Sequence, residues 1–102
     1  MIYPQPGSAG SILTLKPRYG NYINGAFVAP VNGVYFSNTS PVDASLIGEF
    51  PRSDAADIEL ALDAAHAAAD AWGKTSVQDR ALVLLKIADR IEANLELLAV
   101  AE

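Results

Sequence analysis

The sequence contains no cysteine among its 102 residues, and it has one histidine, one tryptophan and one methionine. A chain without cysteine can form no disulfide, no thiolate metal site and no thiol nucleophile, and it fits a reducing compartment, here expected to be the cytoplasm. Basic residues are also few, with Lys+Arg 7 against Asp+Glu 12 and a net charge of -5. Such a chain lacks the positive surface that holds nucleic acid or anionic lipid, so we expect no nucleic-acid partner.

Long apolar runs are missing as well. The opening residues "MIYPQPGSAG" contain no basic segment followed by an apolar one, and no later run approaches the roughly 18 apolar residues of a membrane span. We therefore expect no membrane partner. Neither G-x-G-x-x-G nor G-x-x-x-x-G-K-[ST] occurs, so no nucleotide-binding turn can be assigned. With 51% hydrophobic residues, the chain is still expected to bury apolar surface.

The first half of the sequence predicts short strands. Residues 1–18 mix proline, glycine and serine and are expected to form an extended arm. In "NYINGAFV", the pair Asn24-Gly25 predicts a two-residue type I′ turn between two strands. A second Asn-Gly pair in "PVNGVYF", followed by "NTSP" and "SLIGEFP", predicts two more strands. Residues 19–52 are thus predicted to form an antiparallel β-hairpin region.

The second half has helical periodicity. A first amphipathic helix is predicted at about 54–72, with Ser53 or Asp54 as N-cap, and a second at 77–102, with Ser76 and Asp79 resembling a capping box. No Gly, Asn or Pro closes the second helix at its end, which suggests a chain that continues, although a helix that frays at a natural terminus is the alternative. The apolar faces consist of Ile58, Ala61, Leu62, Ala65, Ala68, Ala69 and Trp72, and of Ala81, Leu84, Leu85, Ala88, Ile91, Leu95 and Leu98.

Few residues offer catalytic or metal-binding chemistry. His66 shares a helix flank with Asp63 and Asp70, at a spacing that would suit part of a metal site or a proton relay. The alternative is a solvated charged flank, which we favour because a further set of ligands is absent. Trp72 lies in phase with the apolar face and is expected to pack in a core rather than on a ligand. The apolar faces of the two predicted helices are larger than so small a chain can bury by itself. We therefore expect a further layer, a sheet, to cover them.

The order and spacing of these segments resemble a known family. The runs "YGNYINGAFVAP", "NTSP", "GEFPRSDAADIELALDAAHAAADAWGKTS" and "DRALVLLKIADRIEANLELLAVAE" are similar to the N-terminal region of the NAD(P)-dependent aldehyde dehydrogenase superfamily. The likeness extends from about Tyr19 to Glu102. The opening "MIYPQPGSAG" and "LKPRYG" are similar to bacterial NAD-dependent members that act on acetaldehyde and other short aliphatic aldehydes.

The resemblance implies an α/β fold. Residues 19–102 would form the incomplete N-terminal part of the cofactor-binding domain, packed on a Rossmann-like sheet built by other residues of the subunit. Enzymes of this family use a cysteine thiolate, a glutamate-activated water and NAD. Because this sequence has no cysteine and its glutamates do not lie in the family's catalytic motif, no catalytic and no cofactor-binding residue is assigned.

One metal site follows from the resemblance. Many members bind a monovalent cation partly through backbone carbonyls just before an Asn-Pro turn, and the matching positions are Asn38 and Thr39 in "NTSP". Here Ser40 replaces the usual Asn, and the side-chain ligand would lie outside these residues. A simple proline turn is the alternative.

The resulting functional hypothesis is the N-terminal fragment of an NAD-dependent aldehyde dehydrogenase that oxidises aldehydes to carboxylic acids. The fragment would be inactive and free of cofactor by itself, with the remainder of the subunit as its partner and a homo-oligomer as the full assembly. The alternative is a small stand-alone helical interaction module, or a subunit of a split dehydrogenase. The aldehyde preferred and the choice between NAD and NADP cannot be derived from these residues.

Overall fold

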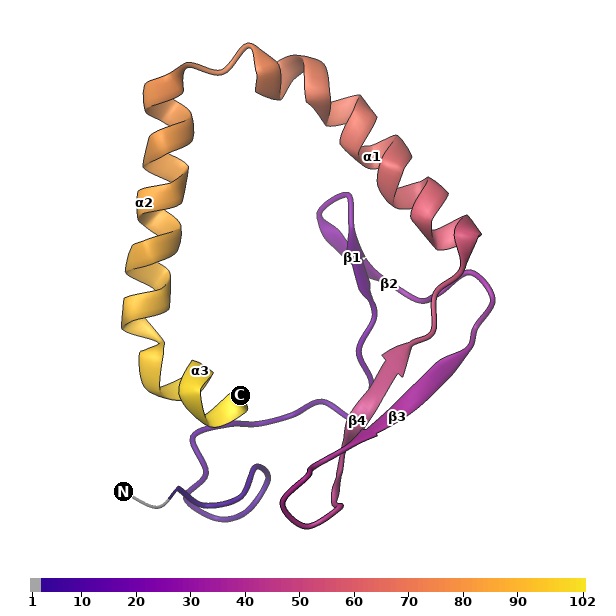
Figure 1. Cartoon of the computed structure of the whole chain (residues 1–102), viewed down its shortest axis with the longest axis vertical. Coiled ribbons are helices and arrows are strands. Elements are labelled where there is room, and N and C mark those ends of the chain that lie inside the picture. The colour runs from indigo at the N-terminus through magenta and orange to yellow at the C-terminus, as the bar shows by residue number, and fades with distance from the viewer. Residues whose placement is uncertain (1–2) are drawn as a thin grey trace. The chain divides into compact units, whose positions relative to one another are not determined.

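The computed structural model describes residues 3–102, which divide into two compact units. One unit is residues 15–70, and the other combines residues 3–14 with residues 71–102. Within the described range, four short strands precede three helices (Figure 1). The predicted class is confirmed: the chain is α/β, with antiparallel strand pairs followed by amphipathic helices.

Strands β1 (Asn21–Ile23) and β2 (Ala26–Val28) form the predicted hairpin. The turn residues Asn24 and Gly25 have φ angles of 52° and 78°. A type I′ turn requires positive φ at both central residues, and asparagine and glycine tolerate it best. The Asn-Gly pair therefore sets the antiparallel register of this hairpin.

Strands β3 (Tyr35–Thr39) and β4 (Leu46–Pro51) form a second antiparallel pair. The end of the predicted arm lies along the free edge of β4, because the Tyr19 N–H donates to the Glu49 carbonyl at 2.9 Å and the Glu49 N–H donates to the Pro17 carbonyl at 3.0 Å. The close approach favours glycine at position 48, because a Cβ there would lie 3.1 Å from the Lys16 carbonyl oxygen, a tight contact. The edge of this sheet is thus covered by the chain itself.

Aromatic and basic side chains pack on one another around this second strand pair. The rings of Tyr19 and Phe50 are stacked with centroids 5.1 Å apart. The Arg18 guanidinium lies 4.0 Å from the Tyr35 ring centroid and also contacts the Glu49 carboxylate at 2.7 Å. Arg18 is therefore held between a ring face and a carboxylate, an arrangement that suits its flat, delocalised charge.

Helix α1 spans Ala55–Gly73, and its hydrogen bonds identify Asp54 as the N-cap. The Ala56 N–H donates to Asp54 Oδ1 at 3.0 Å, and the Ile58 N–H donates to the Asp54 carbonyl at 3.2 Å. Of the two N-cap candidates, Asp54 is thus the one that caps this helix. The negative carboxylate is favourable at this end because it opposes the positive end of the helix dipole.

The predicted single helix over 77–102 is wrong, because the chain forms two helices there: α2 (Val77–Ala93) and α3 (Leu95–Ala101). The break lies at Asn94, whose backbone leaves the helical region with φ -119° and ψ 20°. Its Nδ2 donates to the Arg90 carbonyl at 2.8 Å. Asparagine favours such local side-chain bonds over a continuous helix. The start of α2 is as predicted, since Ser76 Oγ accepts from the Asp79 N–H at 3.1 Å.

Within residues 3–102 no Ala, Val, Ile, Leu, Met, Phe, Trp or Tyr side chain is buried, although Pro30 is. Trp72, expected in a core, is 50% exposed, so it is not a core residue within this chain. The physical reason is that no second layer covers its helix face inside the described residues. None of the helices in residues 3–102 is long and apolar enough to cross a membrane.

Candidate functional site

The predicted cation position lies at the end of strand β3. Asn38 pairs with Gly48 and Thr39 pairs with Leu46, so the register shifts by one residue between them. A register shift interrupts the regular ladder of hydrogen bonds and can redirect a backbone group. The two candidate carbonyls thus belong to an irregular part of the strand, but whether they bind a cation stays a prediction.

The turn that follows is organised by its own polar side chains. The Ser40 N–H donates to the Ser45 carbonyl at 2.8 Å, and Asp43 Oδ1 accepts from the Ser45 hydroxyl at 2.6 Å and from the Ser45 N–H at 3.0 Å. These bonds, the hydroxyl first and the backbone N–H second, lower the pKa of Asp43. The segment is a hydrogen-bonded turn that orders the chain immediately after Thr39.

The charged flank of α1 carries the side chains considered above as part of a metal site. Asp63, His66 and Asp70 are exposed on the helix surface. Within residues 3–102 no group of three or more His, Cys, Asp or Glu side chains is placed to hold a metal ion. The exposure of all three side chains fits a solvated flank, and that interpretation stays a prediction.

Asp57 is the one buried charged residue in the described chain, at 3% exposed. Its two carboxylate oxygens have different partners. Oδ2 accepts from the Asp54 N–H at 3.0 Å, which completes a reciprocal cap at the start of α1. Oδ1 accepts from the Val31 N–H at 2.9 Å, which ties the helix start to the segment after strand β2. One side chain therefore fixes both the helix end and its position relative to that segment.

The electrostatics of Asp57 follow from these bonds. The Val31 N–H, and after it the Asp54 N–H, lower the pKa of the Asp57 carboxyl because both stabilise its charged form. This role of Asp57 is not among the features predicted from the sequence. An acidic residue three positions after an N-cap aspartate was an available signal for the bond to Asp54, whereas nothing in the local pattern predicted the bond to Val31.

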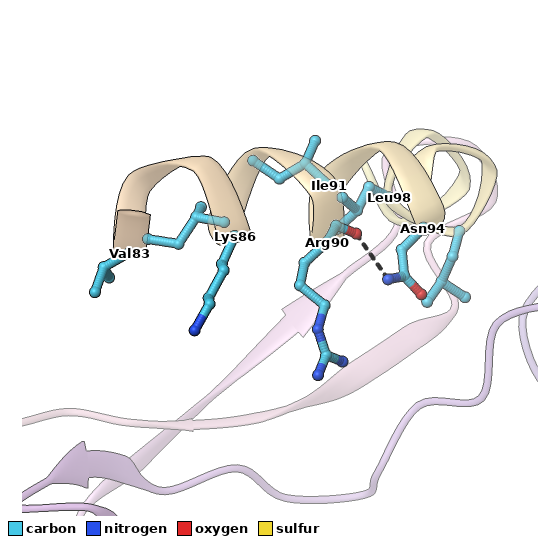
Figure 2. Close-up of a pocket in the computed structure, with 8 residues that line it drawn as sticks. Val83, Lys86, Arg90, Ile91, Asn94 and Leu98 are labelled. Atoms are coloured by element: carbon cyan, nitrogen blue, oxygen red, sulfur yellow. Dashed lines mark hydrogen bonds between the residues drawn. The ribbon is translucent and has the colours of Figure 1, made fainter. Parts of the chain in front are cut away.

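An apolar groove runs along α2 and α3, with a volume of about 450 Å³. Its charged lining residues are Lys86 and Arg90, which project from the same side of α2 (Figure 2). Figure 2 also shows the bond from Asn94 to the Arg90 carbonyl where α2 ends. The apolar lining residues are Val83, Ile87, Ile91, Leu97 and Leu98. The break at Asn94 thus places residues of both helices around one apolar groove with a basic side.

Comparison of the sequence with protein families assigns most of the chain. Residues 27–102 match the model of the aldehyde dehydrogenase family. Because this match covers well over half of the sequence, the chain belongs to the aldehyde dehydrogenase family.

Individual relatives support the same assignment. The chain is 71% identical over all 102 residues to an acetaldehyde dehydrogenase of Pseudomonas aeruginosa and covers 20% of that protein. It is 60% identical over 100 residues, 98% of the chain, to an aldehyde dehydrogenase of Deinococcus radiodurans, of which it covers 19%. It is 58% identical over 102 residues to a long-chain-aldehyde dehydrogenase of an Acinetobacter species, of which it covers 20%. The chain thus spans about one fifth of the length of these curated relatives.

Proposed function

We propose that this chain is the N-terminal region of an NAD-dependent aldehyde dehydrogenase, which oxidises aldehydes to carboxylic acids. The observation that carries the proposal is the 71% identity over the whole chain to an acetaldehyde dehydrogenase. A relative at 58% identity is named for long-chain aldehydes. The proposal is therefore made for aldehydes as a class, with short aliphatic ones first to be tested.

The region would act as scaffold, while the reacting groups come from the rest of the protein. The sequence has no cysteine to serve as nucleophile and no glycine-rich nucleotide-binding turn, so its own residues do not fit the NAD site. What it offers is open apolar surface: Leu84 is 68% exposed and Leu85 is 61% exposed. Surface of this kind favours a covering layer. We propose that a Rossmann-like sheet of the same subunit supplies that layer, in a cytoplasmic homo-oligomer.

The cation site forms part of the same proposal. The carbonyls of Asn38 and Thr39 would supply two ligands to a monovalent cation, and a side chain from outside these residues would complete the set. The irregular register between the two residues and the ordered turn after them support this assignment. Carbonyl oxygens are hard ligands of the kind such cations prefer.

A second candidate function rests on the groove of α2 and α3. An apolar floor beside Lys86 and Arg90 could equally receive an acidic amphipathic segment of another protein. In that case the chain would be a stand-alone interaction module, or one subunit of a split dehydrogenase.

The deciding experiment is to recover the native protein from its own cells with an antibody against residues 57–72 and to measure its intact mass and its aldehyde-dependent reduction of NAD. The dehydrogenase proposal predicts a polypeptide about five times as long as this chain, as the 20% coverage of its relatives implies, with aldehyde-dependent activity. A species of 10.8 kDa without activity would overturn the proposal and favour the interaction module. A species of that mass with a copurifying catalytic chain would favour the split enzyme.

A further inference from the structure

The chain contains two Asn-Gly turns that form a natural pair for comparison. One is Asn24-Gly25, preceded by Ile23, and the other is Asn32-Gly33, preceded by Val31. Both pairs are exposed, both glycines have positive φ, and both asparagines follow a β-branched residue. Their local sequences are thus closely matched, and comparison of the native with the denatured protein separates the effect of the fold from that of the sequence.

Asparagine before glycine is a chemically labile pair. The amide nitrogen of glycine can attack the side-chain carbonyl carbon of asparagine, because glycine has no Cβ to hinder the approach. The attack requires that the glycine N–H be able to lose its proton and that the asparagine side chain be free to turn toward the backbone. Hydrogen bonds to either group oppose the reaction.

The second turn has both groups engaged. The Asn32 side-chain nitrogen donates to the Arg52 carbonyl and to Asp54 Oδ2, both at 3.4 Å, and its oxygen accepts from the Val34 N–H at 3.0 Å. The Gly33 N–H donates to the Pro30 carbonyl at 2.9 Å. The nucleophile and the electrophile of this turn are therefore both held in an unreactive arrangement.

The first turn has neither group engaged. Within residues 3–102, the Asn24 side chain and the Gly25 N–H make no hydrogen bond. The turn closes a hairpin of only two three-residue strands. A two-stranded hairpin of this length has marginal stability in isolation, so local opening that brings the reacting groups together costs little free energy.

We propose that Asn24 is a site of spontaneous deamidation and isoaspartate formation, and that Asn32 is protected. The Gly25 nitrogen forms a bond to Asn24 Cγ, the bond from Cγ to Nδ2 breaks, and ammonia leaves with the proton taken from the Gly25 N–H. Water then opens the succinimide ring at either carbonyl and gives aspartate or isoaspartate at position 24. No oxidant or reductant takes part, and each event adds one negative charge.

The isoaspartate product alters the hairpin. It places an additional backbone carbon between Ile23 and Ala26, which are directly paired across the turn. A type I′ turn has room for two residues of standard backbone, so the longer link breaks the register of β1 and β2. Loss of protection of the hairpin amides is therefore expected to accompany the modification.

The test is to incubate the native protein at mildly alkaline pH and to follow both sites by peptide mapping with mass spectrometry. Deamidation at Asn24 is expected to be faster than at Asn32 by about tenfold, which corresponds to roughly one net hydrogen bond retained in the second turn. The matched control is the same protein in denaturant, where the two sites should react at similar rates. The variant Asn24→Gln should remove the fast reaction, because its longer side chain forms the ring far less readily.

Two outcomes would overturn the proposal. One is a native rate at Asn32 equal to or above the rate at Asn24. The other is a deamidation rate at Asn24 that exceeds the rate at Asn32 by the same factor in denaturant as in the native protein. The local sequence, and not the hydrogen bonds, would then be the cause of the difference. Both readouts are local to the turns and do not depend on the activity of the protein, so the result is independent of the proposed dehydrogenase function.

Discussion

Residues 15–70 and the helices α2 and α3 both expose large apolar side chains, but they differ in how they are held together. Within residues 15–70, polar contacts join segments far apart in the sequence: the Asn21 side chain donates to Ser53 Oγ at 2.7 Å, and Asp57 accepts from Val31. In α2 and α3 the side-chain bonds are mostly local, apart from the Tyr3 hydroxyl, which donates to Glu96. The first region is therefore joined by long-range polar contacts, whereas α2 and α3 rely mainly on bonds between neighbouring residues.

The largest effect is expected at the apolar face of α2. If the proposed layer covers this face in the native protein, Leu84→Ala should lower the free energy of unfolding by about 2–5 kcal/mol, as for other buried leucines. The matched control is Gln78→Ala on the same helix, which should change it by about 0.5 kcal/mol at most. Thermal or denaturant unfolding of the native protein measures both. If both variants change the free energy of unfolding by the same small amount, the apolar face of α2 is open to water in the native protein. A covering layer would then not distinguish α2 and α3 from residues 15–70.

The next effect is expected at Asp57. Asp57→Ala leaves the N–H groups of Val31 and Asp54 without an acceptor, so we expect a fall of several degrees in melting temperature and faster hydrogen exchange at both amides. Asp63→Ala, on the exposed flank of the same helix, should leave both measurements unchanged. If the Val31 amide keeps its protection in Asp57→Ala, the link across these segments is not made by this carboxylate.

A smaller effect is expected at the start of α2. Ser76→Ala removes a single cap bond to the Asp79 N–H and should lower the free energy of unfolding by about 0.5–2 kcal/mol. Hydrogen exchange of the backbone amides in this variant should become faster only in the first turn of α2, because no long-range partner is lost. Spread of the effect to residues 15–70 would contradict the division into two independently held regions. Ser76→Asp, which restores an acceptor, is the rescue control.

The smallest expected effect is a loss of folding stability at acidic pH. The folded-state pKa of Asp57 is lowered, so its contribution to stability is fully present above the ordinary carboxyl pKa of about 4 and is lost as the pH falls through the lowered value. Stability should therefore decline below about pH 4 in the native protein, and less steeply in Asp57→Asn. Asp43 should contribute to the same acid dependence, because its bonds to Ser45 lower its pKa. The variant Ser45→Ala removes the hydroxyl bond and so measures the share of Asp43. Identical acid profiles for all three proteins would show that neither carboxylate contributes.

The features that could be predicted from the sequence are those set by neighbouring residues. The Asn24-Gly25 turn was predictable because its chemistry requires positive φ, and Ser76 was predictable because capping depends on residues three positions apart. The break at Asn94 was missed because the apolar periodicity continues through it, while the decisive bond from its side chain to Arg90 is local and polar. The contact of Asp57 with Val31 joins residues 26 positions apart, and no local pattern encodes it. The same limit applies to the proposed cation site, whose remaining ligand would come from outside this sequence.

The bond from Val31 to Asp57 also bears on the order in which the chain folds. The hairpin of β1 and β2 pairs residues that are close in the sequence, so it can form within microseconds, as short hairpins do. The reciprocal cap at the start of α1 is local too, but joining it to Val31 closes a loop of 26 residues and must first overcome the chain entropy of that loop. We therefore expect the hairpin and the helix to form separately and to join in a later step, whose rate should be the one that Asp57→Ala changes.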